Sequence, residues 1–194
     1  KDGWQACGSM ADAVAAFGQA RRSGISGGRV VIFVTVGAQM PFDRLIVAMD
    51  RWAEANPGAE IVAQIGASAF RPKAMRWVRF LSPEEYDRHY RSAKFVVAHA
   101  GTGSIIAALQ LGKPIVIMPR QAALMETRND HQLATAQQFS RFPSVLVASG
   151  GDELSAKLDM AEGIGSGRTI GQYASDELLT AIRSFIGECS MRAN

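Results

Sequence analysis

A unit of strand, glycine turn, helix and strand constrains this chain most, and it lies between Phe95 and Pro119 (FVVAHAGTGSIIAALQLGKPIVIMP). An apolar, β-branched run ends at His99 and opens into the turn Gly101–Ser104, which a helical apolar pattern and a second buried-strand run follow. Two strands joined through one helix in so short a span predict a parallel βαβ unit. The turn then stands at the amino end of a helix, where unpaired N–H groups and the helix dipole attract anions.

The glycine turn also has a plain explanation, because glycine allows a tight turn without any ligand. The hydroxyl groups of Thr102 and Ser104 add hydrogen-bond donors at the helix start and favour phosphate or diphosphate recognition. Two known phosphate motifs are excluded. The dinucleotide motif needs a third glycine where Ile106 stands, and the P-loop motif fails because the Gly-Lys pair at 112–113 is followed by Pro114.

Strand-like runs alternate with helical patterns along the chain. Strands are predicted at 30–36, 60–65, 77–81, 94–98, 114–118 and 144–148. Helices are predicted at 42–55, 82–92 and 105–111, from Asn129 or Asp130 to 138, and at 152–161 and 176–188, the second of them opening on the capping box Ser-Pro-Glu-Glu. This alternation predicts an α/β fold with a doubly wound, parallel, Rossmann-like sheet.

Composition limits the classes of partner. With 194 residues, 47% of them hydrophobic, we expect one domain at 29–194, preceded by an N-terminal extension or linker at 1–28 that ends in a Gly/Ser-rich stretch. The net charge of +3 suits an anionic ligand, but no dense Lys/Arg stripe indicates nucleic acid. We find no metal-ligand spacing, no transmembrane run and no signal peptide.

In parallel α/β sheets, ligands bind beyond the carboxyl ends of the strands, so the residues just after each strand are the candidates. The longest such stretch is the polar loop 120–132, which has a plain explanation as a solvated loop with a helix cap and a functional one as a sugar site. The five post-strand stretches are 37–39, 66–67, 80–82, 99–104 and 120–132. Besides the glycine turn, the site candidates within them are Gly37, Gln39, Phe80, Leu81, His99, Arg120, Glu126, Arg128, Asn129, Asp130, His131 and Gln132.

Three ordered motifs, TVGAQMPFDRL (35–45), HAGTGSIIAALQLGKPIVIMPR (99–120) and NDHQLATA (129–136), resemble one family. It is the C-terminal, donor-binding half of the family 28 glycosyltransferases, which have GT-B architecture. The resemblance covers about residues 30–150, and within the family it is greatest to the split bacterial exopolysaccharide β-1,4-glucuronosyltransferases.

The resemblance implies a role for each matched segment. Gly101, Thr102, Gly103 and Ser104 would hold the diphosphate of a UDP-sugar. The backbone near Phe80 and Leu81 would read the uracil, residues 129–132 would meet the sugar (His131 and Gln132 foremost), and Gly37 and Gln39 would face the acceptor half. Related enzymes carry an acidic residue for the ribose where Ala107 stands, and Glu126 is the candidate to replace it.

The implied activity is a UDP-sugar-dependent, hexosyl-type glycosyl transfer in exopolysaccharide synthesis. Glucuronate is the expected sugar because the likeness is greatest to glucuronosyltransferases and because Arg120 and Arg128 suit a carboxylate. A UDP-GlcNAc transferase subunit and a non-catalytic nucleotide-sugar-binding subunit are the alternatives. No cofactor or metal is expected, and no catalytic base is assigned. We expect a membrane-associated partner subunit, or an N-terminal domain, to bind a lipid-linked acceptor and supply the base. The chain is then expected in the cytoplasm, peripheral to the inner face of the membrane.

Overall fold

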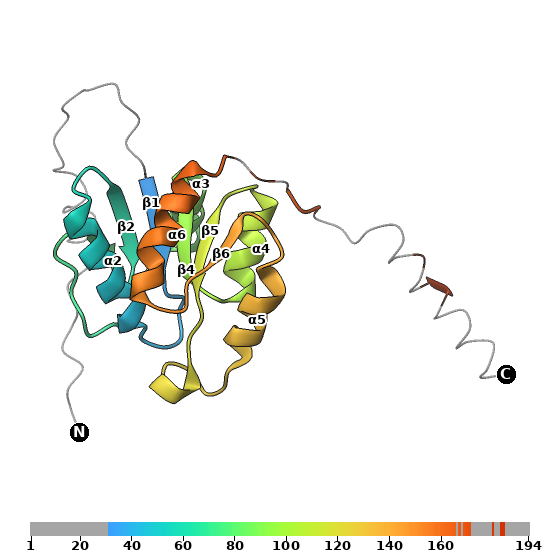
Figure 1. The fold of residues 1–194 in the computed structure, drawn as a ribbon, viewed down its shortest axis with the longest axis horizontal. Coiled ribbons are helices and arrows are strands. Elements are labelled where there is room, and N and C mark those ends of the chain that lie inside the picture. Colours follow the sequence, from blue (N-terminus) through green and yellow to red (C-terminus); the bar gives the residue numbers. More distant parts are fainter. Residues whose placement is uncertain (1–30, 166, 168, 172–179, 181–182, 185–194) are drawn as a thin grey trace.

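A six-stranded, fully parallel sheet forms the centre of the protein in the computed structural model (Figure 1). The structure describes residues 31–165, 167, 169–171, 180 and 183–184. The extension predicted at 1–28 and most of the helix predicted at 176–188 therefore lie outside the described residues. The strand order is β3-β2-β1-β4-β5-β6, with strands β1 (Val31–Thr35), β2 (Glu60–Gln64), β3 (Arg76–Val78), β4 (Phe95–His99), β5 (Ile115–Met118) and β6 (Val145–Val147).

All six strands coincide with predicted runs, and one predicted boundary differs from the structure by more than one residue. The strand expected at 77–81 ends at Val78, and Phe80 is 60% exposed. β3 is an edge strand that pairs only with β2, so it has hydrogen bonds on one side alone. The two bonds that continue this pairing run to the carbonyls of Val78 and Arg79, and the chain leaves the sheet after them.

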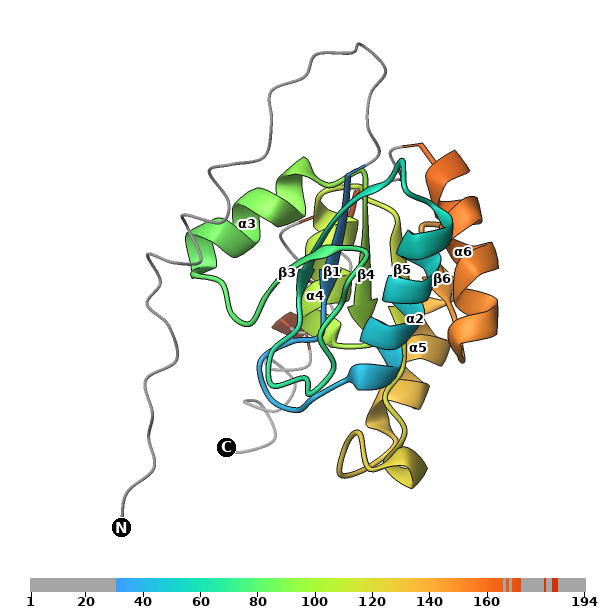
Figure 2. The same ribbon diagram turned by 90° about the vertical axis from the view of Figure 1, so that its left-hand side faces the viewer.

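Helices cover both faces of the sheet. Helices α2 (Asp43–Ala55) and α6 (Gly151–Gly163) lie on one face, and α3 (Pro83–Ser92) and α4 (Thr102–Gln110) lie on the other, as Figure 2 shows. Helix α5 (His131–Phe139) adds Ala136 to the core beneath α3 and α4. The predicted doubly wound α/β fold is confirmed.

Alternation along the strands explains the two layers. In β1, Ile32 and Val34 belong to the core beneath α2 and α6, whereas Phe33 between them packs in the core on the opposite face. In β4, Phe95 and Val97 likewise face the first core while their neighbours face the second. Successive strand residues point to opposite faces, so a central strand covered by helices on both sides is apolar over most of its length.

The helix starts follow their local sequence. The capping box of α3 is formed: the Ser82 hydroxyl accepts from the N–H of Glu85, and the Glu85 carboxylate accepts from the N–H of Ser82. Helix α5 begins after Asp130, one of the two predicted starts, but the Asp130 carboxylate accepts from the N–H of Ala122 in the preceding loop and does not cap α5. Among the described residues, no helix is both long and apolar enough to cross a bilayer.

The strand order places the glycine turn at a point where the chain connections diverge. β1 and β4 are neighbours at the centre of the sheet, and from them the sheet is extended in opposite directions, by β2 and β3 on one side and by β5 and β6 on the other. Such a switch point opens a crevice at the carboxyl ends of the strands, which is where ligands bind in open α/β sheets. The loops after β1 and β4 border this position.

Candidate functional site

The amino end of α4 presents uncapped backbone donors at the carboxyl edge of the sheet. Gly101 is the N-cap residue, and it supplies no side-chain hydrogen bond to the first turn, residues 102–104. An α-helix leaves its first N–H groups without partners inside the helix. Thr102 and Gly103 are exposed, and Ser104 is partly exposed. This end of α4 can therefore donate several hydrogen bonds to an anion, with the helix dipole adding a favourable field.

The two glycines of this turn differ in what surrounds them. A Cβ on Gly101 would come within 2.3 Å of Nε2 of His99, so the fold itself excludes a side chain there. A Cβ on Gly103 would meet nothing within 4 Å. Packing inside this protein therefore explains why position 101 is a glycine, but it does not explain the glycine at position 103. A glycine without such a packing reason is expected where a ligand must approach the backbone closely.

His99 lies between the turns that follow β1 and β4. A Cβ on Gly37, which has a φ of +78°, would come within 2.8 Å of Cε1 of the imidazole. Burial, together with the nearby positive charge of Arg120, lowers the pKa of His99 to about 4, so the ring is neutral at pH 7. Its Nδ1 is buried and has no hydrogen-bond partner among the described residues. A neutral imidazole fits between two glycine turns without adding a charge to the buried edge.

A buried polar network that the sequence analysis missed fixes the turn after β1. The Thr35 hydroxyl donates to Oε1 of Gln64 at 2.8 Å, and Nε2 of Gln64 donates to the carbonyls of Gly37 and Arg79 at 3.1 and 3.0 Å. Thr35 and Gln64 are both buried. The only sequence signal was a polar residue at the carboxyl end of each of two strands whose central residues are apolar. The network joins the ends of β1, β2 and β3 into one rim.

Arg120 does not take the role expected for it. Its guanidinium donates to the carbonyls of Val36, Met40 and Pro41 at 2.8, 2.6 and 2.6 Å and to that of Glu126 at 3.0 Å. The residue is 4% exposed, and its Cζ lies 4.6 Å from the centre of the Phe42 ring. A guanidinium enclosed by four carbonyls cannot also grip a carboxylate of a ligand. Arg120 instead ties the loop after β5 to the loop after β1.

Glu126 is also engaged within the protein, so the role of ribose ligand suggested for it is not open to its carboxylate here. Its two oxygens accept from Nε and Nη2 of Arg44, both at 2.8 Å, and one of them accepts from the N–H of Gln121 at 3.0 Å. Arg44, in the first turn of α2, was not among the candidates from the sequence. Its partner stands 82 positions away, a separation that no sequence pattern indicates.

The residues expected to meet the sugar lie at the end of the same loop and the start of α5. Arg128, Asn129, Asp130 and His131 are exposed. The Asn129 carboxamide oxygen accepts from the His131 N–H at 3.3 Å and contacts the His131 ring, while Oε1 of the buried Gln132 accepts from the Arg120 N–H at 3.1 Å. The structure thus brings 128–132 to the carboxyl side of the sheet, and their contact with a sugar stays a prediction.

Phe80 and Leu81 stand farther along the same edge. They follow β3, three strands from β4, a separation of roughly 14 Å at the usual spacing between strands. Phe80 is exposed, Leu81 is partly buried, and Gln39 is exposed in the loop after β1. The expected contacts of these residues with uracil and with an acceptor half stay predictions.

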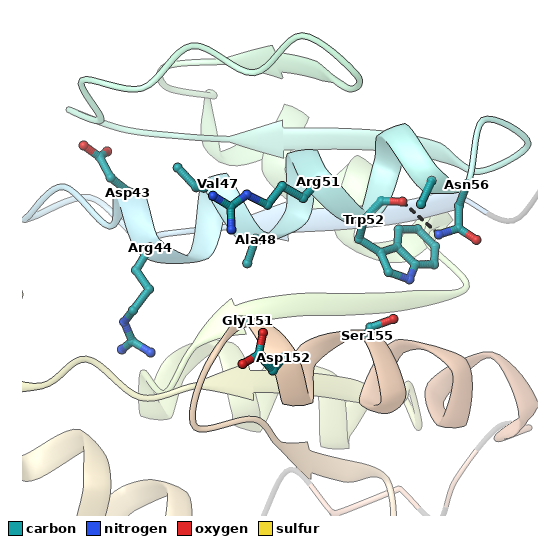
Figure 3. Close-up of a pocket in the computed structure, with 11 residues that line it drawn as sticks. Asp43, Arg44, Val47, Ala48, Arg51, Trp52, Asn56, Gly151, Asp152 and Ser155 are labelled. Atoms are coloured by element: carbon teal, nitrogen blue, oxygen red, sulfur yellow. Dashed lines mark hydrogen bonds between the residues drawn. The ribbon is translucent and has the colours of Figure 1, made fainter.

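A groove of about 760 Å³ lies between α2 and α6, away from the glycine turn (Figure 3). Trp52 and Arg51 of α2 and Ser155 of α6 are among its lining residues, and Arg44 lies at one end. None of the candidates from the sequence lines it. In the part of the chain that the structure describes, no cluster of three His, Cys, Asp or Glu side chains could hold a metal ion.

The protein is similar to several eukaryotic subunits named "UDP-N-acetylglucosamine transferase subunit ALG13". It is 26% identical to that of Yarrowia lipolytica over 142 residues, covering 64% of this chain and 68% of the relative. It is 29% identical to that of Candida albicans over 76 residues (39% and 25% covered) and 30% identical to that of Mus musculus over 119 residues (56% and 10% covered). The chain thus spans a quarter or less of two of these relatives. None of the three is named for glucuronate, so the expected nearest likeness to glucuronosyltransferases is not supported.

Solved structures agree on the fold. A glycosyltransferase of kitacinnamycin superposes with a TM-score of 0.57 at 20% identity, over 76% of this chain and 38% of that one. An NMR structure of ALG13 gives a TM-score of 0.52 at 18% identity, over 75% and 91%. The model of the glycosyltransferase family 28 C-terminal domain matches residues 31–150, which include all six strands and the loops that follow β1, β3, β4 and β5. By this match the chain belongs to the family 28 glycosyltransferases, as their C-terminal domain.

Proposed function

We propose that this chain is the donor-binding subunit of a glycosyltransferase that uses a UDP-sugar, with UDP-N-acetylglucosamine as the donor. One observation carries the proposal: the first turn of α4 is uncapped, lies at the switch point of the sheet, and contains a glycine, Gly103, that packing within the protein does not require. That combination suits a diphosphate approaching the backbone.

The choice of sugar differs from our expectation from the sequence. Glucuronate was favoured by the likeness to glucuronosyltransferases and by two arginines that could bind its carboxylate, but Arg120 is enclosed by carbonyls and, of the two, only Arg128 is exposed. The relatives named above carry UDP-N-acetylglucosamine in their names. Both points support the N-acetylglucosamine donor, with UDP-glucuronate as the competitor in the test.

In the proposed reaction, the bond between the sugar C1 and the diphosphate oxygen breaks as an acceptor hydroxyl oxygen bonds to C1. The N–H groups of residues 102–104 stabilise the negative charge on the departing UDP, and we propose that the step needs no metal or organic cofactor. The neutral His99 supports the turn. The acceptor hydroxyl gives its proton to a base.

We assign the base and the acceptor site to a partner half. Both oxygens of Glu126 are paired with Arg44, and Oδ1 of Asp130 accepts from the Ala122 N–H, so both carboxylates act in holding the loop after β5. A partner that binds a lipid-linked acceptor would place this chain in the cytoplasm, peripheral to the inner face of the membrane.

Calorimetric titration of the purified chain with UDP, uridine, UDP-N-acetylglucosamine and UDP-glucuronate tests the proposal. We expect UDP to bind at least tenfold more tightly than uridine, because the diphosphate carries the contact with α4. We also expect UDP-N-acetylglucosamine to bind more tightly than UDP-glucuronate. Equal binding of UDP and uridine would refute the diphosphate site, and tighter UDP-glucuronate binding would restore the glucuronate donor. UDP binding without transfer in any reconstitution would leave a non-catalytic binding subunit.

A further inference from the structure

Two arginines cross between the loop after β1 and the loop after β5. Arg120, at the end of β5, reaches back to the carbonyls of residues 36, 40 and 41. Arg44, from α2, reaches forward to the carboxylate of Glu126 and to the carbonyl of Pro119, the latter at 2.8 Å. A third contact takes Arg44 to the carbonyl of Ser149 at 2.9 Å. We call Arg44, Glu126 and Arg120 the arginine clamp.

The clamp is largely removed from water. The side chains of Arg44 and Glu126 are 22% and 11% exposed, and Arg120 is 4% exposed as a residue. A two-point arginine–carboxylate pair fixes both distance and orientation, and screening by solvent weakens it less at this burial than at an open surface. Burial lowers the pKa of Arg120 and the charge of Glu126 raises it, so the carboxylate partly offsets the buried positive charge.

The loop between Arg120 and Asp130 has little apolar packing to hold it. Leu124 and Met125, at its outer end, are 50% and 86% exposed, and Met125 has a φ of +55°. Figures 1 and 2 show the short helix at 122–124 extending away from the sheet and its covering helices. Ordering each residue of such a loop costs about 1–2 kcal/mol of backbone entropy, so contacts other than apolar burial must offset this cost. The clamp and the bond from the Ala122 N–H to the Asp130 carboxylate provide them.

We propose that the arginine clamp positions residues 128–132 toward the sugar of the donor. Recognition of the sugar then depends on the clamp, whereas recognition of UDP does not. This inference rests on the proposed function. The diphosphate contact belongs to the β4–α4 turn, which no member of the clamp hydrogen-bonds. By contrast, the Arg120 N–H donates directly to Gln132, within the segment expected to meet the sugar.

The test compares two ligands in matched variants. Glu126→Gln keeps the size of the side chain and removes its charge, and Arg44→Lys keeps the charge and removes the two-point geometry. Glu60→Gln is the control, because the Glu60–Arg76 pair joins β2 and β3 at a position remote from the clamp. Calorimetry gives Kd for UDP and for UDP-N-acetylglucosamine for each protein, with thermal unfolding to confirm that each is folded.

In both clamp variants we expect Kd for UDP-N-acetylglucosamine to rise about fivefold, the effect of one net hydrogen bond, with Kd for UDP changing less than about twofold. Glu60→Gln should change neither. If one clamp variant does not fold, the other decides. A wild-type chain that binds UDP, with clamp variants that change both ligands equally or neither, would overturn the positioning role alone. A wild-type chain that binds no UDP would overturn the proposed function itself.

Discussion

Replacing Gly103 with alanine tests whether ligand binding, rather than folding, requires a glycine at this position. The added methyl group meets nothing within 4 Å in the protein, whereas the same change at Gly101 puts Cβ within 2.3 Å of the His99 ring. Gly103→Ala should therefore fold normally, and Gly101→Ala should be destabilised. If UDP lies over the amino end of α4, the methyl group at 103 takes space that the diphosphate needs.

Gly103→Ala should have opposite effects on the stability of the fold and on the binding of UDP. Alanine is favoured over glycine in a helix by up to about 1 kcal/mol, partly through the unfolded chain, so the free energy of unfolding should hold or rise by about 0.5 kcal/mol. That corresponds to about 2 °C in Tm for a domain of this size. Loss of one hydrogen bond to a charged group costs about 1.5–3 kcal/mol, which weakens UDP binding by about 10- to 150-fold.

Calorimetric titration with UDP and thermal unfolding measure both effects on the same protein. Gly58→Ala is the matched control, because a Cβ there also meets nothing within 4 Å and Gly58 follows α2, away from the carboxyl ends of the strands. It should bind UDP as the wild type does. A Gly103→Ala protein with wild-type Tm that binds UDP within about twofold of the wild type would refute the diphosphate site at α4.

Two further predictions concern buried polar groups at the same edge. The pKa of His99 in the folded protein, about 4, lies below its ordinary value of 6.5, so between these pH values the unfolded chain binds more protons than the folded one. The free energy of unfolding should therefore fall as the pH drops from 6.5 to 4, by at most about 3 kcal/mol. Measured by urea unfolding, the free energy of unfolding of His99→Asn should fall less over this pH range than that of the wild type. An equal fall in the two proteins would exclude His99 as the cause. Thr35→Val should lower the free energy of unfolding by about 1–3 kcal/mol, because Oε1 of Gln64 loses its hydrogen-bond donor. Thr35→Ser keeps the hydroxyl, so it should lose much less stability in the same urea assay. Equal stabilities of the Thr35→Val and wild-type proteins would contradict this role of the hydroxyl.

Local signals accounted for most of the fold. The runs of β-branched residues, the capping box at Ser82 and the glycine turn at 101–104 each act within a few residues, so the strands and helices could be located from sequence. The error at the end of β3 arose because an edge strand with a single neighbour ends where its partner's hydrogen bonds end, and only the pairing with β2 sets that point.

The sequence by itself determined the alternating α/β architecture and the glycine turn before α4, because periodicity and turn chemistry depend on neighbours in the chain. Tertiary structure decided which polar side chains of the loop after β5 stay free. Arg120 and Glu126 are held by groups 84 and 82 positions away, at Val36 and Arg44. Those partners meet only because the strand order brings the loop after β1 beside the loop after β5. Arg120 and Glu126, which the sequence suggested as ligand contacts, therefore hold the loop after β5 in place.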